Sequence, residues 1–269
     1  MKRLLVRFLG VGASQGTPTA TGNWGACDPL EPRNHRTRSS LLIRYWGGER
    51  RDPTQCLIDA APELRAQAIA AGLTQLDAVI FSHEHADQTH GIDDLRAFFM
   101  ERRARLPAFA DAATFSELKR RFAYCFVGKS GFYPAMLDDR LIIAGEVFSV
   151  NGPGGDLAIL PIAQDHGGRP SLGFRIGQLA YCNDVLRLPA ASLELLVGVK
   201  VLIADATKWK TNPAHAHISR ALLWAEKIDC KRLILTNLHH DLDYRRTMDL
   251  VNKRAELAFD GMEIGFNFP

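Results

Sequence analysis

The chain has 269 residues, of which 46% are hydrophobic and 23% are charged, and its formal net charge is +3. This composition predicts a globular fold with ample material for a core. The near balance of 33 basic and 30 acidic residues argues against wrapping a long nucleic acid or coating a membrane, whereas a small anionic substrate is compatible with it.

The opening sequence MKRLLVRFLGVG combines a basic start with an apolar stretch, as a signal peptide does. Arg7 interrupts that stretch, and Gly10 and Gly12 follow it, so a first strand running into a glycine loop fits better. No other segment approaches the roughly 18 apolar residues that span a bilayer. The five scattered cysteines form neither a disulfide framework nor a zinc knuckle. We therefore expect a cytoplasmic protein.

The N-terminal half is predicted to alternate strands and helices within one domain covering residues 1–269. Helices are expected at 62–73, where Pro62 stands at the start, and at 91–106, where apolar residues recur at helical spacing. Apolar runs before and between these helices predict strands at 4–12, 38–46, 55–62 and 76–83.

The segment 107–150 is predicted to be a family-specific insertion, with a helix at 114–126. A further helix is expected at 216–228, where the sequence reads AHISRALLWAEKI. Four more strand-like runs follow the insertion, at 157–168, 171–184, 199–209 and 232–241. No internal repeat or low-complexity segment interrupts this pattern.

Several of these apolar strands end in a potential metal ligand. Because strand ends of an open α/β sheet deliver their side chains to one edge, ligands that are distant in sequence can meet there. Each residue alone also fits a turn or a cap, so the prediction depends on their coincidence. The residues concerned are His83, His166, Asp184, His239 and His240.

The sequence SHEHADQTHG follows the strand at 76–83 and reads as a metal-binding turn. His83 and His85 can bind one ion, while Asp87 projects towards a second. Imidazole and carboxylate together suit Zn, Mn or Fe, whereas an all-oxygen site would suit Ca or Mg. The alternative is a polar surface turn in which Asp87 caps the next helix.

The motifs SHEHAD, QDHG, CND and LTNLHHD together resemble the metallo-β-lactamase superfamily. Nearer still, the chain resembles the PhnP-like phosphodiesterases, through LGVGASQGTP, RTRSS, LIDAAPELR, HGIDDLR, AHISRAL and FDGMEIG. These motifs run from the first strand to the last. The resemblance implies an α/β fold, the four-layer αββα sandwich, in which two mixed β-sheets hold a dinuclear site at one edge.

The resemblance also implies a set of metal ligands. Asp184 would bridge the two ions, and the second ion would add Asp87 and His239. His240 and Asn237 are the alternatives to His239, since relatives more often carry histidine at the position of Asn237. The first ion would take His83, His85 and His166.

Two departures from the family pattern stand out. Gln88 replaces a histidine that relatives commonly carry, and an amide oxygen is a weaker ligand for a borderline metal than imidazole. The second site should therefore bind less tightly or prefer a harder ion such as Mn. PhnP also holds a structural zinc with a cysteine cluster, of which this chain keeps only Cys27, so we expect no third metal.

The resemblance implies that His217, at the start of a helix, protonates the leaving group, with His215 as the alternative. Asp87 and Asp184 would serve catalysis as well as metal binding. His215, Gln88 and Arg38 are predicted to contact substrate, although Arg38 and its neighbour Arg36 fit a solvated strand edge equally well. Other candidates have structural interpretations: Asp59 would orient a ligand histidine, and Cys182 would lie in the core.

These features predict a metal-dependent hydrolase with one or two Zn or Mn ions, most simply a phosphodiesterase acting through a metal-activated water. Its substrate would be a small anionic nucleotide-like or cyclic sugar phosphate, with no long nucleic acid and no membrane as partner. Alternatives are a thioesterase, lactonase or RNA-processing nuclease of the same fold, or a catalytically weakened nucleotide-binding protein. Whether the protein forms a homodimer is left open.

Overall fold

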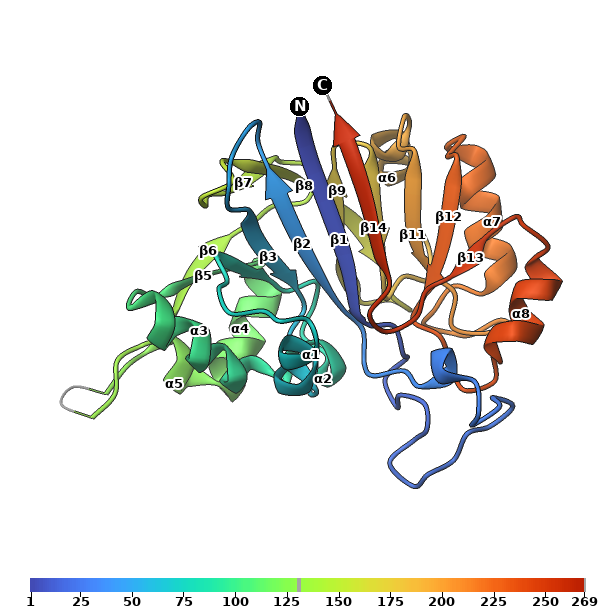
Figure 1. Cartoon of the computed structure of the whole chain (residues 1–269), viewed down its shortest axis with the longest axis horizontal. Helices are drawn as coiled ribbons and strands as arrows, with labels where there is room; N and C mark the ends of the chain where they lie inside the picture. The colour runs from blue at the N-terminus through green and yellow to red at the C-terminus, as the bar shows by residue number, and fades with distance from the viewer. Residues whose placement is uncertain (130–131, 269) are drawn as a thin grey trace.

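The computed structural model describes residues 1–129 and 132–268. Two seven-stranded mixed sheets stand face to face, and helices cover the outer side of each (Figure 1). The fold is therefore the αββα sandwich that the motifs predict. The helices from the green part of the chain flank one sheet, and those from its orange part flank the other.

The first sheet has the strand order β14-β1-β2-β3-β4-β5-β6. Neighbours from β14 to β3 pair antiparallel, and those from β3 to β6 pair parallel. The strands are β1 (Lys2–Gly10), β2 (Ser40–Trp46), β3 (Thr54–Ile58), β4 (Ala78–Ile80), β5 (Leu106–Ala110), β6 (Leu137–Leu141) and β14 (Glu263–Phe268).

The second sheet has the strand order β13-β12-β11-β10-β9-β8-β7. Its pairs are antiparallel from β7 to β10 and parallel from β10 to β13. The strands are β7 (Phe148–Val150), β8 (Leu157–Asp165), β9 (Pro170–Ile176), β10 (Leu179–Cys182), β11 (Val201–Asp205), β12 (Arg232–Thr236) and β13 (Glu256–Leu257).

The described helices are short, and none is long and apolar enough to cross a membrane. The α-helices are α1 (Leu64–Ala70), α2 (Ala86–Thr89), α3 (Leu95–Arg102), α4 (Ala112–Arg121), α5 (Ala123–Phe126), α6 (Ala190–Leu196), α7 (Ile218–Lys227) and α8 (Tyr244–Val251). Two 3-10 helices complete the set, at Pro32–Asn34 and Ile92–Asp94.

Side chains of the first sheet alternate between two hydrophobic cores, as the period of two in a strand requires. In β2, Leu41 and Ile43 face the core between the sheets, whereas Leu42 faces the core beneath the helices. In β4, Ile80 faces the core between the sheets and Val79 faces the core beneath the helices. Strands buried on both faces explain why these segments read as continuous apolar runs.

The predicted segments match observed elements with several differences. Strands β5, β6, β7, β13 and β14 were not predicted, and the helix expected at 91–106 is a 3-10 turn followed by α3, which ends at Arg102. The run 171–184 is two strands, β9 and β10, which reverse at Gly177, a glycine with a φ of 57°. The helix at 114–126 is broken at Phe122 into α4 and α5. The pattern also gave no indication of helices α6 and α8.

The segment 107–150 contributes to both sheets. It holds nearly all of β5, together with β6 and β7, and β6 and β7 are the edge strands at the same end of the sandwich. Residues 130 and 131 of this segment, and residue 269, lie outside the described part of the chain. Its status as a family-specific insertion stays a prediction.

Candidate metal centre

Three imidazoles meet at one edge of the sandwich. His83 follows β4 by three residues, His85 directly precedes helix α2, and His166 directly follows β8. One ligand nitrogen from each lies within 4.8 Å of the others, and the ring centroids of His83 and His85 are 4.5 Å apart. Because their strands end at the same edge, His83 and His166 meet although they are 83 positions apart in sequence.

Two of these rings are oriented by hydrogen bonds through Nδ1. His83 Nδ1 lies 3.0 Å from Ser82 Oγ, which itself donates to the buried Asp59 carboxylate at 2.9 Å. Because the hydroxyl proton goes to Asp59, Ser82 accepts from His83. His166 Nδ1 lies 2.7 Å from the carbonyl oxygen of Ala214, which can only accept. Both rings therefore carry hydrogen on Nδ1 and present the lone pair of Nε2.

These rings fit a transition-metal ion. The Nε2 atom of His83 is buried and has no hydrogen-bond partner, which is costly unless a ligand fills the site. Burial, followed by the neighbouring His85, lowers the pKa of His83 well below its ordinary value. Burial also lowers the pKa of His166, so both rings are neutral near pH 7, as metal ligands must be.

Ser82→Ala is expected to weaken metal binding by about 10–100-fold, the usual effect of losing a partner that orients a ligand histidine. The substitution removes the link between Asp59 and the His83 ring while all three imidazoles remain. Competition with a chromophoric chelator measures the change. Ser149→Ala, at an exposed position of β7, is the control and should bind as the unmodified chain does. An unchanged affinity in Ser82→Ala would contradict an orienting role.

Asp184 lies beside the histidines and is surrounded by amides. Asn183 Nδ2 and Gln88 Nε2 donate to its Oδ2 atom at 2.6 and 2.9 Å, and Asn237 Nδ2 donates to its Oδ1 atom at 3.1 Å. Burial, followed by the nearby Asp87 carboxylate, raises the pKa of Asp184 well above its ordinary value. The three amides supply hydrogen bonds that this buried carboxyl group requires.

His215 is the fourth histidine of the group. Its ring lies 4.7 Å from that of His166, and its Nδ1 atom lies 2.9 Å from Asp205 Oδ2 and 3.6 Å from Asp184 Oδ1. Burial alone lowers the pKa of His215, but the Asp205 carboxylate, with Asp184 and Asp87, outweighs it and raises the pKa to about 9. With Nδ1 bonded to Asp205, the Nε2 proton is available for donation.

The loop between β11 and α7 holds His215 in this place. Asp205, the last residue of β11, accepts hydrogen bonds from the backbone and hydroxyl of Thr207 and from the backbone of Val185. Asn212 then accepts from the backbone nitrogens of residues 214 and 215, which forms a tight turn. The same turn points the carbonyl of Ala214 at His166.

Three residues of the site have left-handed backbone conformations. Asp59, Asp184 and Asn237 follow strands and have φ values of 63°, 48° and 58°. Asp and Asn adopt this conformation more readily than other residues with a Cβ atom, although at some cost. Strained positions of this kind gather at functional sites, and here they turn side chains from strand ends into the group.

Several predicted residues lie elsewhere. His217 occupies the N-cap position of α7 and makes no capping hydrogen bond, and its ring is not part of the histidine group. His239 pairs with Asp241 at 3.2 Å and stacks on His240, in a separate cluster. The sequence favoured His217 as the proton donor and His239 as the C-terminal metal ligand. In the structure, His215 and Asn237 are the residues of these two segments that lie beside Asp184.

The two arginines are occupied in other ways. Arg38, a predicted substrate contact, pairs with Glu63 at 2.9 Å. Arg36 is 2% exposed and donates to the carbonyl oxygens of His239 and Leu242, so it fixes the turn that follows β12. Within the described residues, neither side chain forms a hydrogen bond or ion pair with the histidine group.

Three residues of the site were not predicted. Asp205 ends an apolar strand, so the rule that identified Asp184 could also have identified it. Asn183 and Ser82 each directly precede a predicted ligand, but a polar residue in that position carries no distinctive signal in one sequence. Their roles emerge only from the hydrogen bonds in the folded protein.

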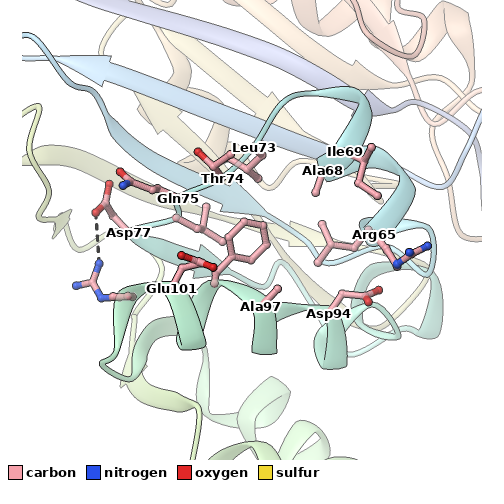
Figure 2. Close-up of a pocket in the computed structure, with 14 residues that line it drawn as sticks. Arg65, Ala68, Ile69, Leu73, Thr74, Gln75, Asp77, Asp94, Ala97 and Glu101 are labelled. Carbon is pink, nitrogen blue, oxygen red and sulfur yellow. Dashed lines mark hydrogen bonds and ion pairs between the residues drawn. The ribbon is translucent and has the colours of Figure 1, made fainter.

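A separate cavity of about 800 Å³ lies between helices α1 and α3 (Figure 2). Ala68 and Ile69 border it from α1, and Ala97 and Glu101 from α3. An ion pair of 3.3 Å between Asp77 and Arg102 lies at one end. Its lining contains no histidine, so this cavity is not part of the candidate metal centre.

The chain is similar to proteins of known families. Residues 54–239 match the model of the beta-lactamase superfamily domain. A solved diphosphatase from the PhnP family is 30% identical, with a TM-score of 0.87, over 99% of this chain and 98% of that one. Zinc-bound PqqB from Methylobacterium extorquens, at 18% identity, shares the fold with a TM-score of 0.72 over 97% of this chain and 99% of its own.

A curated relative is the octanoyltransferase of Porphyromonas gingivalis, which is 30% identical over 260 residues. The match covers 95% of this chain but only 50% of that protein. The chain therefore spans about half the length of this relative, which is longer than the hydrolase fold described here.

Proposed function

Because this chain belongs to the beta-lactamase superfamily and, within it, to the PhnP family, we propose that it is a metal-dependent hydrolase that cleaves a small phosphodiester. The observation that carries the proposal is the combination of three imidazoles with a histidine–aspartate pair. His83, His85 and His166 would hold an ion, and His215 with Asp205 stands beside them.

A divalent ion such as Zn or Mn, bound by the three imidazoles, would polarise a phosphoryl oxygen and lower the pKa of a water molecule. The protein supplies the remaining groups. His215 holds a proton at Nε2 and would donate it to the leaving oxygen, while Asp205 orients the ring and keeps it protonated. His217 lacks such a partner, and burial and the nearby Arg220 lower its pKa.

The loop that carries His215 also supports a small, anionic, nucleotide-like substrate. Trp209, which is 37% exposed, and Lys210 precede the histidine, whereas the neighbouring Lys208 pairs with Asp241 at 3.3 Å. A lysine can pair with phosphate and an indole can stack on a base, which are contacts that a nucleotide-like substrate can use. The near-neutral overall charge gives no support for a long nucleic acid.

A thioesterase is the second candidate, and the relative from Porphyromonas gingivalis favours it. That protein is named for octanoyl transfer, and this chain matches about half of its length. A hydrolase domain joined to an acyltransferase would act naturally on an acyl thioester. The same centre would polarise the thioester carbonyl, but a thiolate leaving group would need less help from His215.

Turnover of four substrate classes separates these proposals. The protein, loaded with Zn or Mn, is assayed with bis-p-nitrophenyl phosphate, a 2′,3′-cyclic nucleotide, a nucleoside diphosphate and an octanoyl thioester. We expect hydrolysis of the diesters that a chelator abolishes and added metal restores. Hydrolysis of the thioester alone would favour the second candidate. Hydrolysis of the diphosphate alone would indicate that the substrate is a phosphoanhydride and not a phosphodiester. Inactivity towards all four with metal bound would contradict the proposed function.

A further inference from the structure

We infer that the centre holds one metal ion and that amide side chains occupy the places from which a second ion would be bound. This inference rests on the proposed function for the first ion only. It depends on the surroundings of Asp184, the carboxylate that would otherwise bridge two ions.

The lone pairs of Asp184 are largely used. A carboxylate oxygen has two in-plane lone pairs, and Oδ2 of Asp184 accepts from both Asn183 and Gln88. Oδ1 accepts from Asn237, which leaves one lone pair directed elsewhere. The residue is only 2% exposed, so these hydrogen bonds are shielded from bulk water. Asp184 can therefore serve one ion through Oδ1, but it cannot bridge two without losing buried hydrogen bonds.

The orientation of the Gln88 amide follows from its neighbours. Its nitrogen lies 2.9 Å from Asp184 Oδ2 and 3.3 Å from Asp87 Oδ2, so it stands between two carboxyl groups. An amide oxygen in that position would face two acceptors, whereas the NH₂ group can donate to both. Gln88 is fully buried, so its NH₂ group is held as a donor to the two carboxyl groups, while its Oε1 atom has no hydrogen-bond partner.

Asn237 completes the replacement from the other side. It follows β12 directly, its side chain is buried, and its nitrogen lies 3.1 Å from Asp184 and 3.2 Å from His215 Nδ1. Both amides thus contact the carboxylate that a second ion would share. His215 lies within 4.8 Å of Asp184 and His166, but its Nδ1 atom is paired with Asp205, whose carboxylate also accepts from Thr207 and Val185. The half-buried Asp87 is thus the carboxylate left for such an ion besides Asp184.

The number of ions bound per chain tests this inference without any assay of activity. The protein is freed of metal, saturated with Zn²⁺, dialysed and analysed by elemental mass spectrometry. We expect one ion for the unmodified chain and two for the double variant Gln88→His/Asn237→His, which exchanges two amide donors for imidazole ligands. Histidine tolerates the left-handed backbone of position 237 better than most residues do.

The control is Gln75→His/Asn151→His, which adds two histidines at exposed positions outside the cluster and should bind one ion. The single variants Gln88→His and Asn237→His are also measured, because they still test the inference if the double variant does not fold. Either single variant should gain measurable affinity for a second ion. Two ions in the unmodified chain would overturn this inference alone, and none would overturn the proposed function as well. One ion in every folded variant at 88 and 237 would show that the amides are not what excludes the second ion.

Discussion

His83→Ala is expected to lose tight binding of a transition metal, and hydrolytic activity with it. The ring is 1% exposed, its Nε2 atom has no partner in the protein, and Ser82 fixes its direction. Loss of a partner that merely orients a ligand costs about 10–100-fold in affinity, so loss of the ligand itself should cost more than about 100-fold. Chelator competition measures the affinity, and turnover at limiting metal measures the activity.

His90→Ala is the matched control for this experiment. His90 lies in the same segment, but its exposed ring packs edge-to-face against Phe122 and is outside the histidine group. Its removal should leave metal affinity unchanged. Full metal content in His83→Ala, or loss of metal in His90→Ala, would show that the turn binds an ion through a different set of residues.

His215→Ala should reduce kcat by roughly 10²–10⁴-fold on a diester with an alkoxide leaving group, because a positioned general acid contributes about that much. A p-nitrophenolate leaving group needs little protonation, so the loss on bis-p-nitrophenyl phosphate should be much smaller. The ratio of the two losses therefore reports proton donation separately from binding or folding. Comparable losses on both substrates would instead indicate that His215 binds substrate or supports the centre.

His217→Ala distinguishes His215 from His217, the histidine that the sequence favoured as the proton donor. The residue stands two positions further along the same chain segment, at the start of α7, outside the histidine group. We expect kcat on both substrates to change little. A large loss confined to the alkoxide-leaving diester in His217→Ala, with none in His215→Ala, would return the proton donor to the position that the motif first suggested.

The fold could be predicted largely because its strands are buried on both faces. Segments such as those forming β4 and β11 are continuous apolar runs, and polar residues at or soon after the end of each mark the sheet edge. The hairpin of β9 and β10 was read as one strand because only Gly177 and Gln178 separate two apolar runs. Helix α8 went unpredicted although Asp243 caps it and Tyr244 and Val251 are buried along one side.

The candidate site was predictable where regular structure positions it and less so where loops do. His83 and His166 follow strands, and counting residues from the strand was sufficient to place them. The choice between His215 and His217 depends on a turn set by Asn212, and spacing alone does not determine which ring faces inward. Asn237 adopts a left-handed conformation, so the alternation of β12 does not continue to His239.

The turn around Ala214 joins two parts of the chemistry in one stretch of backbone. Its carbonyl group orients His166, and the next residue is His215. An ordered turn therefore favours ion binding, and by thermodynamic linkage a bound ion must favour the ordered turn by the same free energy. A chain without its ion would hold His215, which delivers the proton, and His166, which holds the ion, less firmly. Binding of the metal ion would then order His215, the proton donor, as well as the ion's own ligands. The proton donor and the Lewis acid would therefore become available together.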